Sequence, residues 1–138
     1  MTATDYAKAA GIAALVLSLD LLFAIVVVLI WSIFIEPGHP RAYYETAGVP
    51  LARWSTRIFG TALIGAAAWL CARRRPERNA VAFAIALTIG YAVLDGATVA
   101  FQGFFTLSIA ITMLLKLLGA LAGALLAVRG AVSRRQPS

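Results

Sequence analysis

Four long apolar runs separated by short polar segments account for most of the 138-residue chain. The runs span about residues 9–35, 51–72, 79–101 and 107–128. Each reaches the length of about 20 residues that a helix needs to cross the hydrocarbon core of a bilayer. The pattern therefore predicts an all-α integral membrane protein, a four-transmembrane-helix antiparallel bundle built from two hairpins. The first run is too long for a signal-peptide core, so we expect it to be retained as a span.

Two segments outside the spans also suggest structure. Residues 36–50 contain Pro40, which can open a helix, and Gly48, which can end one. Together with the adjacent Tyr43 and Tyr44, this favours a short interfacial helix in the first periplasmic loop. Residues 129–138 form a basic C-terminal tail. The whole chain, residues 1–138, is predicted to be a single membrane domain.

Composition and charge support this interpretation. Hydrophobic residues make up 62% of the chain and charged residues 13%, with a mean hydropathy of +0.88. Soluble domains are about half apolar and about a quarter charged. The net charge is +6, but most basic residues flank the apolar runs, which predicts contact with the lipid bilayer and no nucleic-acid partner. Their distribution predicts a multi-pass protein of the cell inner membrane with both termini in the cytoplasm, the inner side holding Lys8, Arg73, Arg74, Arg75, Arg78, Arg129, Arg134 and Arg135.

A polar stripe crosses the third run. Its members recur at steps of three and four residues, so they fall on one face of a helix. A polar face within a membrane span must contact protein or water rather than lipid. The stripe therefore predicts a binding surface centred on Asp95 and formed by Thr88, Tyr91, Asp95, Thr98 and Gln102.

Each predicted span also carries one ionisable residue away from its ends, and these residues are Asp20, Arg57, Asp95 and Lys116. At about 1.5 Å per residue, these side chains lie about 18 to 24 Å from the inner boundary. An unpaired charge at the centre of a span costs about 2.5–3.5 kcal/mol, which favours pairing inside the bundle. We expect Asp95 to pair with Lys116 and Asp20 to pair with Arg57, each pair within one hairpin. An alternative for Arg57 is extension toward the headgroups.

Small residues lie beside two of these charges. Gly119 and Gly123 share a face with Lys116 and form a G-x-x-x-G, and Gly60 lies one turn from Arg57. Such residues allow helix backbones to approach closely, so we expect these three glycines to pack helices.

The predicted outer side gathers a further polar group. It could form a periplasmic mouth or a partner surface, and its members are Glu36, His39, Arg41, Tyr43, Tyr44 and Arg53. With one histidine and one cysteine, Cys71, the chain has too few ligands for a zinc site or a bis-histidine haem. We expect no metal and no cofactor.

Three functions fit these features. The first is binding or translocation of a small polar or ionic ligand at the charged layer, with or without proton coupling, by a homo-oligomer. The second is a structural or accessory subunit of a larger membrane complex, in which the charges pair the helices. The third is a membrane enzyme acting on a lipid, with Asp95 or Asp20 as base, although the sequence contains no recognisable hydrolase motif.

In span number, and in an acid placed in the first span (Asp20), the chain resembles the small multidrug resistance exporters. Bases in two other spans and a long first periplasmic loop depart from that pattern, so no residue roles are transferred from it.

Overall fold

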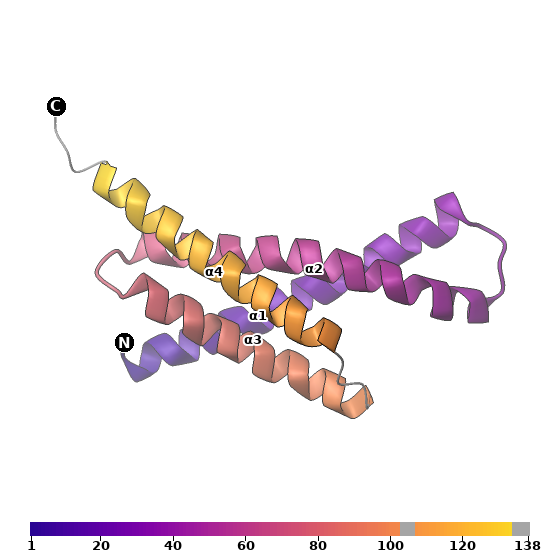
Figure 1. Ribbon diagram of the computed structural model, residues 1–138, viewed down its shortest axis with the longest axis horizontal. Coiled ribbons are helices and arrows are strands. Elements are labelled where there is room, and N and C mark those ends of the chain that lie inside the picture. The colour runs from indigo at the N-terminus through magenta and orange to yellow at the C-terminus, as the bar shows by residue number, and fades with distance from the viewer. Residues whose placement is uncertain (103–106, 134–138) are drawn as a thin grey trace.

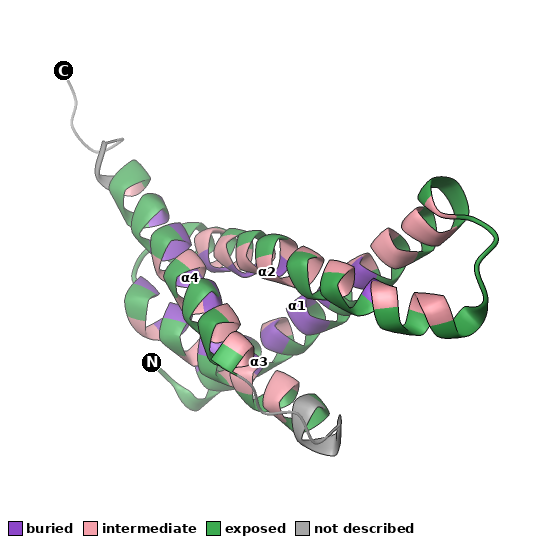
Figure 2. Cartoon of the chain, turned by 45° about the vertical axis from the view of Figure 1, so that its right-hand side comes forward, coloured by how far each residue is buried: buried purple, intermediate pink, exposed green. Residues whose placement is uncertain are grey.

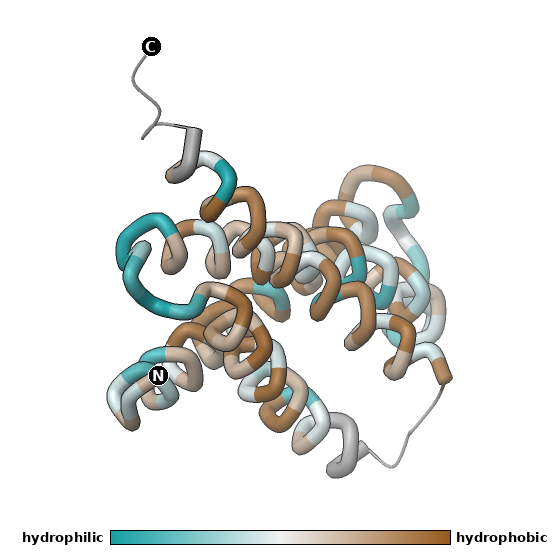
Figure 3. The backbone as a smooth tube through the Cα atoms, turned by 60° about the vertical axis from the view of Figure 1, so that its left-hand side comes forward, coloured by the Kyte–Doolittle hydropathy of each residue, from teal (hydrophilic) through white to brown (hydrophobic). Residues whose placement is uncertain are grey.

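The structure is a computed structural model that describes the backbone of residues 1–102 and 107–133. Its described side chains are those of residues 1–98 and 107–131. Every regular element in these ranges is helical: α1 (Ala3–Ile30), η1 (Trp31–Ile35), α2 (Arg41–Arg74), α3 (Ala80–Gln102) and α4 (Leu107–Ser133) (Figure 1). Four of these helices are long and apolar enough to cross a membrane. Figure 3 shows their largely hydrophobic backbone traces and the hydrophilic turn between α2 and α3.

The first helix begins at a capping box and ends in a wider π-helical turn. The backbone N–H of Thr2 donates a hydrogen bond to Oδ2 of Asp5 at 3.0 Å, which satisfies a donor at the start of α1. At the other end, the N–H of Glu36 donates to the carbonyl of Trp31 at 3.0 Å. The chain then turns through Gly38, whose φ of +88° is a conformation that favours glycine.

The predicted interfacial helix is wrong as a separate element. A single helix of 34 residues, α2, runs from Arg41 to Arg74 and passes through both Gly48 and Pro50. Its first turns carry an exposed Arg41–Glu45 ion pair at 2.7 Å. Gly48 is buried against α1, where an added Cβ would lie 3.2 Å from a methyl carbon of Val28. Packing along α1 thus overrides the local tendency of glycine and proline to end a helix.

The helices pack in the order α1, α2, α4, α3, so that α1 lies diagonally across from α4. Figure 2 shows the buried residues on the faces that these helices turn toward one another. Alanine dominates this core, with Ile64, Leu87 and Phe83 among the largest fully buried apolar side chains. Small side chains let the helix axes approach closely over most of their length.

The two ends of the molecule differ in shape. We name them after the sides predicted from the sequence: the inner end carries the N-terminus and the α2–α3 turn, and the outer end carries the α1–α2 turn. Arg78 contacts Asp5 at 3.5 Å and joins two segments at the inner end. Together α1 and η1 form a continuous helical segment of 33 residues, Ala3–Ile35, that is about 50 Å long. The 23-residue α3 is about 35 Å long. The first hairpin therefore extends beyond α3 and α4 at the outer end (Figure 1).

The last helix is longer than expected. α4 continues to Ser133, so the first residues of the predicted basic tail are helical, while residues 134–138 lie outside the described part.

Candidate functional site

Three helices contribute to a buried ion pair at the centre of the molecule. The Nζ of Lys116 on α4 lies 2.9 Å from Oδ2 of Asp20 on α1. The hydroxyl of Tyr91 on α3 donates to the same oxygen at 2.8 Å, and Lys116 also contacts this hydroxyl. All three residues are at most 1% exposed. We call Asp20, Tyr91 and Lys116 the inner tier.

The fourth helix supplies space rather than a polar group. A Cβ added to Gly60 on α2 would lie 2.4 Å from Oδ2 of Asp20 and 2.8 Å from Cε of Lys116. Because α1 and α4 lie diagonally opposite, the lysine side chain must cross the centre of the packing to reach the aspartate. The missing side chain of Gly60 leaves room for this crossing.

The pairs expected from the sequence are therefore wrong. Lys116 pairs with Asp20 instead of Asp95, and Asp20 pairs with Lys116 instead of Arg57. Neither Arg57 nor Asp95 takes part in an ion pair with any described side chain. The expected pairs assumed that partners lie within one hairpin, whereas the observed pair joins the first hairpin to the second.

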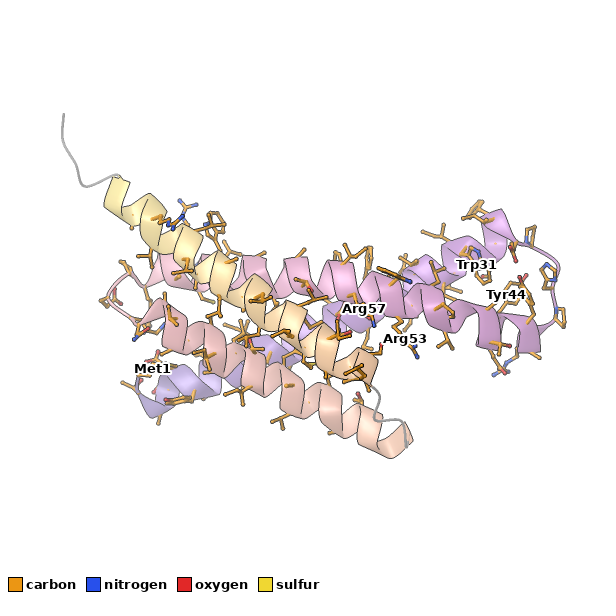
Figure 4. All side chains as sticks on the ribbon, in the orientation of Figure 1. Met1, Trp31, Tyr44, Arg53 and Arg57 are labelled. Atoms are coloured by element: carbon orange, nitrogen blue, oxygen red, sulfur yellow. The ribbon has the colours of Figure 1, made fainter. Side chains whose placement is uncertain are left out.

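Arg57 is held by hydroxyl groups of α4. Its Nε donates to Oγ1 of Thr112 at 3.1 Å, and its Nη2 donates to the hydroxyl of Ser108. The guanidinium also lies 5.6 Å from the ring centre of Trp54. Figure 4 shows Arg57 reaching from α2 toward α4, with Arg53 nearby on the same helix. Ser108, Thr112 and Lys116 follow one another at four-residue steps, and this spacing is the sequence signal that could have found Ser108.

The polar stripe of α3 changes from buried to exposed along its length. Thr88 and Tyr91 are buried, Asp95 is half-buried and Thr98 is exposed. The two threonine hydroxyls donate to carbonyls of their own helix, Thr88 to Ala84 at 2.9 Å and Thr98 to Asp95 at 2.7 Å. The side chain of Gln102 lies outside the described part. Tyr91 is thus the stripe member that contacts the ion pair.

The remaining charges lie about one helical turn farther out. Asp95 is four residues beyond Tyr91, and Arg57 is three residues outward from Gly60, which corresponds to about 4.5–6 Å along the helices. We call Arg57, Asp95, Ser108 and Thr112 the outer tier. All four are half-buried, in contrast to the inner tier.

Below the inner tier, α2 and α4 are in backbone contact. A Cβ on Gly123 would lie 2.1 Å from the carbonyl oxygen of Gly65, and one on Gly119 would lie 2.8 Å from that of Thr61. Gly65 was not anticipated from the sequence, because no second glycine at four-residue spacing marks it. This contact closes the inner side of the ion pair with apolar and backbone atoms.

The predicted periplasmic mouth divides into two parts. Tyr43 donates to the carboxylate of Glu36, Tyr44 donates to the Glu36 carbonyl at 2.6 Å, and the backbone N–H of His39 donates to the Tyr44 hydroxyl at 3.1 Å. His39 stacks on Tyr43 at 4.2 Å, and Trp31 meets Tyr44 edge-on at 5.9 Å (Figure 4). Arg41 and Arg53 lie outside this aromatic cluster and are exposed.

The described side chains include no group of three or more His, Cys, Asp or Glu residues that could hold a metal ion. Cys71 is a free cysteine. What the site offers chemically is a neutral buried pair and, on its outer side, one guanidinium, one carboxylate and two hydroxyls that are partly accessible.

No family model, no curated protein and no solved structure matches the chain. The function is therefore argued from the geometry alone.

Proposed function

We propose that the chain is a multi-pass inner-membrane protein, a four-helix bundle with cytoplasmic termini, that binds a small polar or ionic ligand from the outer side. Translocation would follow if the ion pair of the inner tier opened. The observation that carries the proposal is the step in burial between the tiers: the outer tier is half-buried, and the inner tier is sealed.

The outer tier has the groups that such a ligand needs. Arg57 has no carboxylate partner among the described residues, so its charge is available to an anionic group. Asp95 likewise lacks a cationic partner in the described part. Charged residues at membrane depth that are not neutralised by each other are candidates for ion or substrate pathways.

The inner tier has the properties of a gate. Ser108, Thr112 and Lys116 lie on one face of α4 and lead from the outer end to the ion pair. Oδ1 of Asp20 is buried without a hydrogen-bond partner, so this carboxylate has an acceptor site to spare for a proton or a water molecule. Breaking the contact with Lys116 would expose both partners to the outer tier.

The first experiment measures access by water. In a Cys71→Ser background, a charged methanethiosulfonate reagent added from the outer side is expected to modify Thr112→Cys. Ala120→Cys, two turns inward and fully buried, is expected to be unreactive, as is Leu118→Cys on the exposed apolar surface. Equal lack of reaction at all three positions would contradict an accessible outer tier.

The second experiment measures proton movement. Proteoliposomes containing the protein and an internal pH dye are subjected to a potassium diffusion potential. We expect a proton flux that Asp95→Asn reduces at least about tenfold while insertion is unchanged. If Asp95→Asn and Lys116→Met both retain the wild-type flux, the charges have no role in translocation.

A second function, as an accessory subunit, has support from the projecting hairpin. Phe34 is 77% exposed and Ile35 is 67% exposed, beside the aromatic cluster at the outer end. Such a surface suits a membrane partner. Gentle solubilisation should then recover a stoichiometric partner, whereas a monodisperse homo-oligomer with proton flux would favour the first function. The lipid-enzyme alternative loses Asp20 as a base, because this carboxylate is enclosed by protein.

A further inference from the structure

A groove lies between the inner ends of α2 and α4, beside the α2–α3 turn. Its volume is about 400 Å³, and its walls include Trp69, Arg73, Pro76, Leu126 and Gly130. This volume falls within the roughly 300–1,000 Å³ of ligand sites. A smaller cavity of about 150 Å³ shares Pro76 with it and is lined by Arg78. We call the two together the basic groove.

The two arginines of the groove differ in their contacts. Arg73 lies 4.7 Å from the ring centre of Trp69 and contacts no carboxylate among the described residues. Arg78 donates to the Cys71 carbonyl at 3.2 Å and lies 3.5 Å from Asp5, yet its Nε is buried without a partner. The side chain of Arg78 is only 8% exposed, so this donor has little access to bulk solvent. Its guanidinium also stacks on the Phe83 ring at 3.5 Å, so Arg78 is engaged by protein groups and contributes positive charge to the smaller cavity.

The rest of the groove is apolar. Leu126 on α4 is 62% exposed, and Trp69 on α2 is half-buried. The site therefore combines guanidinium groups at its turn-facing side with an apolar wall that continues onto the helix surface. Guanidinium groups bind phosphate oxygens in a bidentate manner, and basic pockets between membrane helices on the cytoplasmic side suit anionic headgroups.

We propose that the basic groove binds the phosphate of an anionic membrane lipid, with Arg73 as the donor, Arg78 as a neighbouring positive charge, and Leu126 and Trp69 along the first part of an acyl chain. This inference rests on the membrane placement in the proposed function, but it does not depend on the charge tiers. A lipid is favoured over free phosphate because the apolar wall would otherwise have no occupant.

The test uses Trp69 as the reporter. In a Trp31→Phe, Trp54→Phe background, fluorescence quenching is measured with brominated phosphatidylglycerol and with brominated phosphatidylcholine in mixed vesicles. We expect phosphatidylglycerol to quench at an about tenfold lower mole fraction, because charge-assisted hydrogen bonds favour it. The ratio between the two lipids cancels changes in the intrinsic emission of the tryptophan.

Two pairs of matched variants separate the site from general surface charge. Arg73→Gln should reduce the lipid preference below about twofold, while Arg74→Gln, with the same loss of charge in the adjacent residue, should retain it. Gly130→Leu should fill the groove without disturbing the fold, because an added Cβ there meets no atom within 4 Å. Gly11→Leu has the same open surroundings on α1 and should leave the preference unchanged.

Four results would overturn the proposal. If Arg73→Gln and Arg74→Gln lost the preference for phosphatidylglycerol equally, that preference would be due to general surface charge. Equal quenching by both lipids would reject the site while leaving the membrane placement intact, whereas no quenching by either would contradict both. Reversal of phosphatidylglycerol quenching by millimolar inorganic phosphate would identify a free-phosphate site instead.

Discussion

The two tiers have the same charges but different surroundings. In the inner tier, Lys116 and Asp20 neutralise each other and are sealed by Tyr91. In the outer tier, Arg57 donates hydrogen bonds to two hydroxyls, and Asp95 forms no ion pair with a described side chain. Both residues are half-buried. One helical turn thus separates a closed, neutral contact from an open, polar one.

The difference indicates how the chain combines stability with access. A fully enclosed charge requires its partner, because desolvation of an unpaired ion costs several kcal/mol. A half-buried charge retains part of its hydration, so hydroxyl partners are sufficient. The inner tier should therefore govern folding, while the outer tier should govern contact with a ligand.

The largest expected effect comes from breaking the enclosed pair. Lys116→Met leaves the carboxylate of Asp20 buried without a cation and should cost about 3–5 kcal/mol of unfolding free energy. Unfolding by sodium dodecyl sulfate in mixed micelles, followed by circular dichroism, measures this loss. Asp20→Asn combined with Lys116→Met should recover part of it, because no buried charge remains.

The comparison variant is Arg57→Met in the outer tier. If its cost equalled that of Lys116→Met, the two tiers would be energetically alike, and the distinction between a folding tier and a ligand tier would fail.

Removing the tyrosine hydroxyl should have the next largest effect. Tyr91→Phe keeps the buried ring but deprives Oδ2 of Asp20 of a donor, and hydrogen bonds to charged groups contribute about 1.5–3 kcal/mol. The same unfolding titration applies. Thr88→Val is the matched control on α3, since the Thr88 hydroxyl bonds only to its own helix. Equal losses in the two variants would show that the hydroxyl of Tyr91 has no special role.

The glycine contact that closes the inner side should be sensitive to a single methyl group. Gly123→Ala places a Cβ against the backbone oxygen of Gly65 and should cost about 1–3 kcal/mol through displacement of α4 from α2. Gly130→Ala lies on the same helix in open space and should be neutral or slightly stabilising. A neutral Gly123→Ala would mean that the two helices are not in such close contact.

Much of the fold could be predicted from the pattern of apolar runs. That pattern specifies four long helices, because only helices of this length satisfy the backbone of such apolar segments. The continuous α2 could not be predicted, because Gly48 and Pro50 locally favour a break, whereas in the structure the helix continues through both residues with Gly48 buried beside Val28 of α1.

The sequence singled out Asp20, Tyr91 and Lys116 as candidates, but it did not predict that Lys116 pairs with Asp20. Depths counted along the helices put Asp20 and Lys116 at about 18–20 Å, and Arg57 and Asp95 at about 24 Å. Those depths already match the two tiers. Pairing within hairpins gave the wrong partners, because a sequence does not state which helices lie diagonally or that Gly60 opens a passage between them.

The smallest expected effect compares conservative exchanges of the two bases. Arg57→Lys keeps the charge in a half-buried position and loses only part of the contact with Ser108 and Thr112, so it should cost less than about 1 kcal/mol. Lys116→Arg must fit a larger, planar group beside Gly60, where Cε already fills the space, and should cost more. Arg57→Lys should still weaken the proton flux, because a lysine cannot reproduce the contact of the guanidinium with the two hydroxyls, and it should change the thiol reactivity of Thr112→Cys. An Arg57→Lys protein with unchanged flux and unchanged thiol reactivity would remove Arg57 from the ligand tier, even if the stability difference between the tiers remained.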